Sequence, residues 1–225
     1  RKTNHFASYD EVVKKFAKMV EIDPWLINPF FAKCGDVDFE AGTGLDGLMA
    51  TVDTILAKIR KKYKEYGIKD KPFVIVKADA GTCGMGIMTV RDSREVRDLN
   101  SKQRNKMTVV KDGREVHDYI VQEGVYTFEQ IEESVAEPVV YMIDRYVVGG
   151  FYRVHQDRGV DENLNAPGME FVPLAFAQQH AVPDMRAKPG TAAPNRFYMY
   201  GVVARLALLA ASLELEKTDP NPEIY

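Results

Sequence analysis

The segment Phe73–Val90, FVIVKADAGTCGMGIMTV, constrains the fold more than any other part of the chain. Residues 73–76 are aromatic or β-branched, which favours a buried strand, and Lys77 closes that strand. Glycines follow at positions 81, 84 and 86, and the apolar residues 87–90 predict a second strand. A glycine-rich turn can aim several backbone N–H groups at one anion, and a neighbouring lysine adds a positive charge. The segment therefore predicts a hairpin whose loop binds phosphate.

Two common phosphate-binding patterns do not describe this segment. A Walker A loop, GxxxxGK[ST], has its lysine after the glycines, whereas Lys77 precedes them. A GxGxxG dinucleotide turn opens a helix, whereas residues 87–90 have the pattern of a strand. A strand, a loop and a strand, with lysine at the end of the first strand, resemble the ATP-grasp fold instead. An ordinary hairpin with an unspecialised glycine loop is the alternative interpretation.

The composition excludes several classes of protein. The chain has 225 residues, of which 45% are hydrophobic, enough for one large domain or two small ones. A net charge of −3 gives no basic excess for binding nucleic acid or an acidic membrane surface. Cys34 and Cys83 form neither a disulfide framework nor a zinc-binding spacing, which indicates a reducing, cytoplasmic setting. No run reaches the roughly 18 apolar residues that span a bilayer, and no signal peptide is visible.

Hydrophobic periodicity predicts two helices before the glycine-rich segment. The first covers residues 8–21 and begins at a capping box formed by Ser8 and Glu11. The second covers residues 43–66 and ends at Gly67, a typical C-terminal stop signal.

Two helices are expected after it. Residues 93–99 predict a short polar helix with Ser93 as its N-cap. Residues 197–213 predict a helix that is apolar on most faces and therefore buried. The tail, residues 214–225, is expected to have little structure of its own.

The sequence also predicts two further hairpins and one apolar segment. The first hairpin turns at Asp112-Gly113 and the second at Asp144-Arg145. The expected strands are 107–110 with 115–121, then 137–143 with 146–154, and the apolar segment is 169–177. The chain is thus divided into a helical segment over 1–70, a small α+β lobe over 71–126 and a C-terminal lobe over 127–225.

Four features suited to nucleotide binding or catalysis follow one another in the sequence. Lys77 adjoins the loop 79–86, and a strand leaves the small lobe at residues 122–125, where backbone N–H and C=O groups can contact an adenine edge. Glu137 and Arg153 flank the second hairpin, and a loop of small residues, 163–168, comes last. This order predicts a nucleotide held between two lobes.

Longer phrases carry a closer resemblance. KADAGTCGMGIMTV, VQEGV, AEPVVYMIDRYVVGGFYRVH and ENLNAPGMEFVPLAF resemble the proteobacterial ATP-grasp type of glutamate–cysteine ligase, over most of residues 25–215. The last part is also similar to glutathione synthetases, with an acidic residue, a hairpin, the glycine pair and arginine of GGFYR and a small-residue loop. The resemblance implies an α+β ATP-grasp fold in which two lobes enclose ATP.

The resemblance implies a carboxylate–amine ligase for glutathione biosynthesis. ATP phosphorylates the γ-carboxylate of L-glutamate, and the amine of L-cysteine then displaces phosphate to form γ-glutamylcysteine. Transfer of a phosphoryl group needs positive groups around its oxygens. The implied catalytic residues are Lys77, Arg153 and Asn165; the implied nucleotide-binding residues are Lys77, Gly81, Thr82, Gly84, Met85, Gly86, Gln122, Glu123, Gly124, Val125 and Glu137; and the implied substrate-binding residues are Arg153, Asn163 and Asn165.

The metal is the least defined part of this prediction. The reaction implies Mg²⁺, which prefers hard oxygen ligands, and the candidates are Asp79 and Glu170. The late acidic residue and ExN pattern of many ATP-grasp enzymes do not occur in this chain. Cys83 stands where tyrosine is expected and is interpreted as a tolerated variant. For His155, contact with phosphate and a plain surface position are both open.

Two other functions are alternatives. Another ATP-grasp ligase, such as a glutathione synthetase, fits less well because the ExN pattern is absent. An ATP-binding module without catalysis fits less well because Lys77, Arg153, Asn163 and Asn165 are all present. Family members are longer than 225 residues and the chain starts at Arg1, so a further N-terminal portion is expected. The substrates are expected to be small molecules, without nucleic acid or membrane, and a homo-oligomer is an open possibility.

Overall fold

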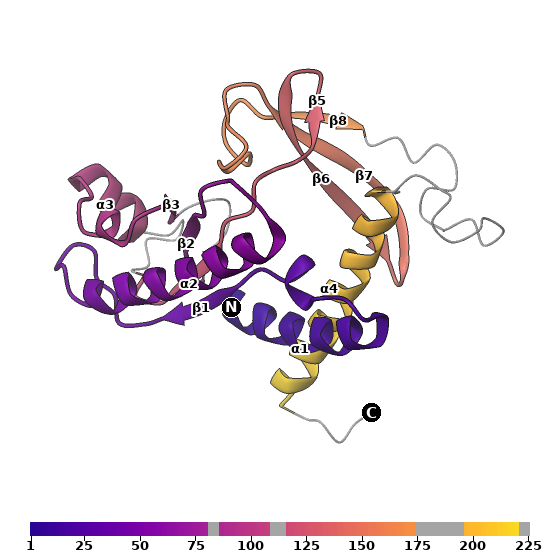
Figure 1. Cartoon of the computed structure of the whole chain (residues 1–225), viewed down its shortest axis with the longest axis horizontal. Coiled ribbons are helices and arrows are strands. Elements are labelled where there is room, and N and C mark those ends of the chain that lie inside the picture. Colours follow the sequence, from indigo (N-terminus) through magenta and orange to yellow (C-terminus); the bar gives the residue numbers. More distant parts are fainter. Residues whose placement is uncertain (81–85, 109–115, 174–195, 221–225) are drawn as a thin grey trace.

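The computed structural model describes residues 1–80, 86–108, 116–173 and 196–220. Two antiparallel sheets lie apart from each other, and each has a long helix beside it (Figure 1). The α+β class predicted from the sequence is confirmed.

The first sheet has the strand order β1-β4-β2-β3. Strands β2 (Val74–Ala78) and β3 (Ile87–Val90) form the predicted hairpin on either side of the glycine-rich loop. Strand β4 (Tyr119–Glu123) pairs with β2 on one edge and with β1 (Phe31–Cys34) on the other. The sequence did not predict β1, so the N-terminal segment contributes a strand as well as helices.

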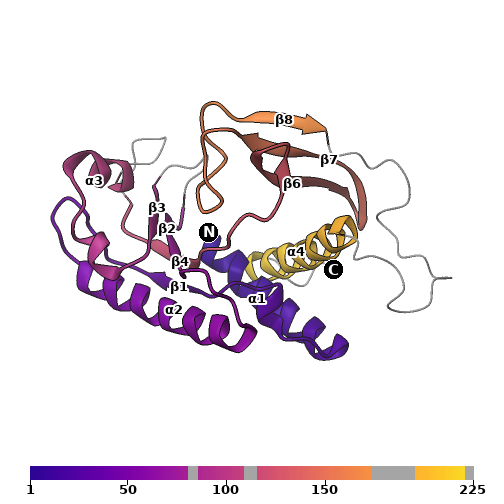
Figure 2. The ribbon, with the colours of Figure 1, turned by 45° about the horizontal axis from the view of Figure 1, so that its top comes forward.

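Helix α2 (Leu45–Tyr66) covers one face of this sheet, as Figure 2 shows. It ends at Gly67, whose φ of 68° suits glycine, in agreement with the prediction. Its apolar stripe meets alternate residues of the strands, because side chains of a strand alternate between faces. The buried helix residues are Leu48, Val52, Ile55, Leu56, Ile59 and Tyr63, and their partners include Val74, Val76, Ala78, Tyr119 and Val121.

The segment after β3 differs from the prediction. A 3₁₀ turn, η2 (Ser93–Val96), is capped by the Asp92 carboxylate and not by Ser93. Helix α3 (Ser101–Thr108) then takes up Met107 and Thr108, which were expected to begin a strand. The rest of that predicted hairpin, 109–115, lies outside the described residues.

A capping box explains why α3 forms there. The Asn100 amide N–H donates to the Gln103 side chain, and the Gln103 N–H donates to Asn100 Oδ1, both at 2.9 Å. This reciprocal pair satisfies two N–H groups at the start of a helix. The N-x-x-Q pattern is therefore a helix signal that the sequence prediction missed.

Helix α1 (Lys2–Val20) begins six residues before the predicted start. Ser8 is buried within it, so the predicted capping box of Ser8 and Glu11 is wrong. Glu21 ends the helix in the left-handed region (φ 56°), and a short turn, η1 (Pro24–Leu26), follows.

The second sheet has the order β5-β6-β7-β8. Strands β6 (Ser134–Ile143) and β7 (Tyr146–His155) form the second predicted hairpin, and Asp144 at its turn has a positive φ of 51°. Strands β5 (Gln130–Ile131) and β8 (Glu170–Pro173) flank it. The predicted apolar segment 169–177 is described only through β8.

Helix α4 (Arg196–Thr218) extends five residues beyond the predicted end. One side packs on α1 through Leu206 and Ala210, but Leu209 is 56% exposed and Leu215 71% exposed. The prediction that this helix is buried is therefore wrong for its outer side. Contrary to the sequence expectation, residues 198–218 are long and apolar enough to cross a membrane, although a single helix of this kind is weak evidence for doing so.

Candidate functional site

The first sheet presents Lys77 and Gln122 on the face opposite α2. Strand pairing sets Ile75 against Gln122 and Lys77 against Ile120, so these side chains share one face. Lys77 Nζ donates to Gln122 Oε1 at 2.7 Å. The predicted phosphate lysine and the predicted strand exit are thus joined directly.

Burial lowers the pKa of Lys77, and the neighbouring positive charge of Lys2 lowers it further. The carboxylate of Glu137, which belongs to the second sheet, acts in the opposite direction. The two sheets therefore bring Lys77 and Glu137 within electrostatic reach. In the described part of the chain the Lys77 ammonium contacts an amide oxygen and no carboxylate, so its charge is available to a bound anion.

Arg153 and Glu137 face each other across the β6–β7 pair. Arg153 Nη1 donates to Glu137 Oε1. Arg153 Nε is buried and has no hydrogen-bond partner among the described residues. A buried N–H without an acceptor is costly, so an anionic oxygen placed there would be favoured.

His155 fastens the small-residue loop to the same face of β7. It is only 4% exposed, its Nδ1 accepts the Asp157 backbone N–H at 3.2 Å, and its Nε2 lies 3.0 Å from the Pro167 carbonyl oxygen. Because Nδ1 is an acceptor, Nε2 carries the proton and donates to Pro167. The structure therefore favours a positioning role for His155 over the surface position that the sequence left open.

The two predicted asparagines lie close together in this loop. Asn163 Oδ1 accepts the Asn165 N–H at 3.1 Å, so the Asn163 side chain shapes the loop. Both residues line a cavity of about 480 Å³ between the loop and the β3–α3 region, together with Thr89, Lys106 and Arg158. The Arg91–Asp161 ion pair also joins the two parts of the chain here.

The exit of β4 is held on both sides. The Glu123 N–H donates to the Phe30 carbonyl at 2.7 Å, and the Gly124 N–H donates to the Phe73 carbonyl at 2.9 Å. Because the N–H groups of Glu123 and Gly124 are already bonded, the first backbone N–H that can donate to a nucleotide base is that of Val125. The Glu123 side chain lies on the α2 face, away from Lys77 and Gln122, so the structure does not bring its carboxylate to their face.

The predicted metal ligands are not brought together. Asp79 is buried, and its two oxygens accept the Thr3 N–H at 2.7 Å and the Thr3 hydroxyl at 2.8 Å. Glu170 is exposed on β8 and pairs with Val154, so it lies on the sheet face opposite Arg153. Within the described ranges, no group of three His, Cys, Asp or Glu residues could hold a metal ion.

Most of the glycine-rich loop, including Gly81, Thr82, Gly84 and Met85, lies outside the described residues. Gly86 closes the loop at a φ of 61°, and its carbonyl accepts the Ala78 N–H at 2.9 Å. A Cβ at Gly86 would lie 3.2 Å from that of Ala78. This position therefore needs glycine for both its conformation and its close approach to β2.

Comparison with known proteins identifies the family. The family model described as glutamate–cysteine ligase matches residues 1–215. The chain belongs to the glutamate–cysteine ligase family. A crystal structure of a candidate gamma-glutamylcysteine synthetase from Methylobacillus flagellatus KT is 62% identical over 97% of the chain, with a TM-score of 0.85. The match covers 51% of that protein, so the chain spans about half its length. No curated protein matches the chain.

Two supporting contacts in this chain were not predicted from its sequence. The Trp25 indole and the Phe30 N–H both donate to the Glu123 carboxylate, at 3.0 and 2.9 Å. The Thr3 N–H and hydroxyl donate to the two oxygens of the Asp79 carboxylate. Each joins residues more than 70 positions apart, and nothing in the local sequence pattern signals such pairs.

Proposed function

We propose that the chain carries the ATP and acyl phosphate site of an ATP-dependent glutamate–cysteine ligase with the ATP-grasp fold. The observation that carries the proposal is that Glu137, which is paired with Arg153 on the second sheet, lies within electrostatic reach of Lys77 on the first. In this proposal residues 71–126 form one lobe together with β1 and α2 of the segment 1–70, and residues 127–225 form the other. The family match supports it.

The residues present fit an anionic nucleotide. Lys77 has an ammonium without a carboxylate partner in the described part of the chain, and Arg153 Nε is a buried donor without an acceptor there. Both needs are met by phosphoryl or acyl phosphate oxygens. The adenine would meet the backbone from Val125 onward, beside Gln122.

Among the described residues, the two predicted metal ligands do not form a magnesium site. Asp79 is engaged by Thr3, and Glu170 projects from the other face of its sheet.

The reaction needs charge stabilisation more than acid–base chemistry. As the γ-carboxylate of glutamate attacks the γ-phosphoryl group of ATP and ADP leaves, negative charge spreads over the transferred oxygens. Lys77 stabilises that charge from the first sheet, and Arg153 from the second. When the neutral cysteine amine attacks the acyl phosphate carbon, the C–N bond forms, the C–O bond to phosphate breaks and the amine proton passes to the departing phosphate, whose oxygens Arg153 stabilises. Asn163 and Asn165, in the loop held by His155, orient the substrates.

We further propose that the partners are small molecules only, ATP, L-glutamate and L-cysteine, and that the protein works in the cytoplasm. The net charge of −3 supports this proposal, since it offers no basic surface to nucleic acid.

The test measures ATP binding by calorimetry and phosphate release with glutamate plus cysteine, omitting each amino acid in turn. We expect release to require both, and Lys77→Met to lower it by about 10²–10³, the range for losing one preorganised donor. Lys61→Met, on the exposed surface of α2, is the matched control. Turnover by Lys77→Met equal to that of the control, or a parent chain that neither binds ATP nor releases phosphate, would refute the proposal.

A further inference from the structure

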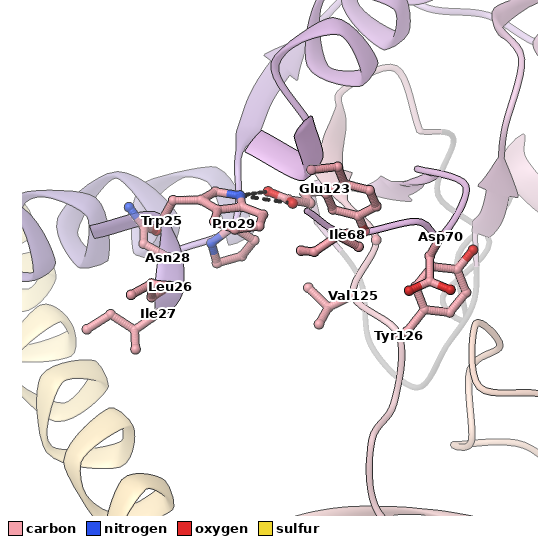
Figure 3. A pocket seen from close by; sticks show the side chains of 12 residues that line it. Trp25, Leu26, Ile27, Asn28, Pro29, Ile68, Asp70, Glu123, Val125 and Tyr126 are labelled. Atoms are coloured by element: carbon pink, nitrogen blue, oxygen red, sulfur yellow. Dashed lines mark hydrogen bonds between the residues drawn. The ribbon is translucent and has the colours of Figure 1, made fainter. Parts of the chain in front are cut away.

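A second cavity lies at the exit of β4 on the α2 side of the first sheet (Figure 3). Its volume is about 510 Å³, within the range of small-molecule sites. Trp25 and Asn28 lie at one end, Asp70 and Tyr126 at the other, and Glu123 between them. Because Glu123 and Gln122 project to opposite faces of the sheet, this cavity is separate from the face that carries Lys77.

Glu123 places a buried negative charge in the cavity wall. It is 3% exposed, and burial raises the pKa of its carboxyl. Its hydrogen-bond donors, the Trp25 indole and the Phe30 N–H, are neutral. No lysine, arginine or histidine is among the described residues that line the cavity. A buried carboxylate without a cation is costly, so a positive ligand would be favoured here.

Asn28 adds an acceptor without a donor. It is 8% exposed, and its Nδ2 donates to Asp10 Oδ1 at 2.8 Å, which fixes the orientation of the amide. Asn28 lies between this cavity and a neighbouring one that contains Asp10, and because Nδ2 donates to Asp10, Oδ1 is on the other branch of the amide. Oδ1 is buried and has no hydrogen-bond partner among the described residues. A buried acceptor without a donor is costly, so a ligand N–H group that reached Oδ1 would be favoured.

The remaining lining suits the body of an organic cation. Trp25, Tyr63 and Tyr126 supply aromatic rings, and Asp70 adds an exposed carboxylate at the far end. The Tyr126 hydroxyl already donates to the Lys71 carbonyl. Aromatic faces and carboxylates together attract ammonium and guanidinium groups. Amino acids do not fit, because nothing in the described lining would pair with their carboxylate.

We propose that this cavity binds a small organic cation, an ammonium or guanidinium group on an apolar body, with its charged head at Glu123 and Asn28. The cavity lies on the opposite face of the sheet from Lys77, and Val125, which lines it, also adjoins the backbone assigned to the adenine of the proposed ligase site. A second positive group on the ligand would meet Asp70.

Trp25 makes the proposal directly testable, because it is the only tryptophan of the chain and it lines the cavity. Its fluorescence is titrated with n-butylammonium, n-butylguanidinium and 1,4-diaminobutane at constant ionic strength. Neutral n-butanol and L-glutamate serve as ligand controls. We expect a saturable change with the cations and none with the two controls.

Variants separate the cavity from general charge effects. Glu123→Gln, with circular dichroism to confirm folding, is expected to weaken cation binding by about tenfold or more. Asp70→Asn, on the surface and harmless to folding, is expected to weaken the diamine by about threefold. Glu65→Gln removes a charge from α2 outside the cavity and should change neither. No saturable change with any cation, or equal affinities in Glu123→Gln and Glu65→Gln, would overturn the proposal.

Discussion

Gly124 follows the last residue of β4 and lies against the ring of Phe73. A Cβ placed at Gly124 would lie 2.0, 2.1 and 2.6 Å from three ring atoms of Phe73, far inside van der Waals contact. Phe73 is fully buried and packs edge-on against Tyr126, with ring centroids 4.9 Å apart. The ring cannot move without disturbing that pair, so Gly124→Ala must shift the backbone or the ring.

Overpacking of this kind costs about 1–3 kcal/mol, and removing a buried Phe side chain costs about 3–5 kcal/mol. If the clash is the cause, Phe73→Ala makes room for the new methyl group. The double variant should then cost less than the sum of the two single variants, by about 1–3 kcal/mol. For a chain of this length the single Gly124→Ala change should lower the melting temperature by about 2–4 °C per kcal/mol.

Urea unfolding of the four proteins measures this coupling. Gly47→Ala is the matched control, because nothing lies within 4 Å of a Cβ there and the site is inside α2. That change is expected to stabilise by about 0.5–1 kcal/mol. If Gly124→Ala is as stable as the parent chain, or if the two changes add within about 0.5 kcal/mol, the close packing of Gly124 and Phe73 is wrong.

Three other predictions follow from single contacts. His155→Phe leaves the Pro167 carbonyl without its donor, so it should lower the free energy of unfolding in urea by about 1–3 kcal/mol. It should also raise KM more than it lowers kcat, and an effect on kcat alone would contradict a positioning role. Because burial raises the pKa of Glu123, the protonated group stabilises the fold below its unfolded pKa, and this contribution is lost as pH rises through the folded pKa. In melting curves taken above pH 4.5, the melting temperature of Glu123→Gln should therefore decrease less with pH than that of the parent chain. Equal decreases in the two proteins would contradict the prediction. Leu206→Ala should cost about 2–5 kcal/mol, whereas Leu209→Ser on the outer side of α4 should stay within about 0.5 kcal/mol, and equal losses would show that both sides are packed.

The sequence predicted the elements whose signals are local. The strands around the glycine-rich loop and the hairpin that turns at Asp144 have β-branched or alternating residues, and α2 has an uninterrupted apolar stripe with Gly67 at its end. In each case the deciding residues lie within one element or its cap, so a reading of period and turn chemistry is sufficient.

The errors arose where tertiary contacts or a second local signal decided the outcome. Strand β1 has only four residues and forms because its neighbour β4 offers an open edge. The start of α1 at Lys2 coincides with the acceptance of the Thr3 N–H by Asp79, 76 residues away. At α3 the capping pair Asn100 and Gln103 outweighed the strand propensity of the residues that follow.

The contacts within the candidate site also depend on tertiary structure and could not be predicted from local sequence. The resemblance named Lys77, Glu137 and Arg153, and the structure shows Lys77 in electrostatic reach of Glu137 and Glu137 bonded to Arg153, but only the pairing of distant strands determines those contacts. The role of His155 could not be predicted, because its two ring nitrogens are engaged by backbone groups that carry no sequence signature.

The end of β4 shows why one short segment can serve two purposes. Gln122 and Glu123 are adjacent, and the pleat of the strand sends them to opposite faces. Gln122 contacts Lys77, while the Glu123 carboxylate holds the N-terminal segment through Trp25 and Phe30. Because the Glu123 N–H also donates to the Phe30 carbonyl, both the backbone and the side chain of Glu123 join the strand exit to the N-terminal segment. Because these bonds end at Glu123, directly before Gly124 and Val125, we expect loss of the Glu123 charge to loosen the backbone beside the proposed nucleotide site.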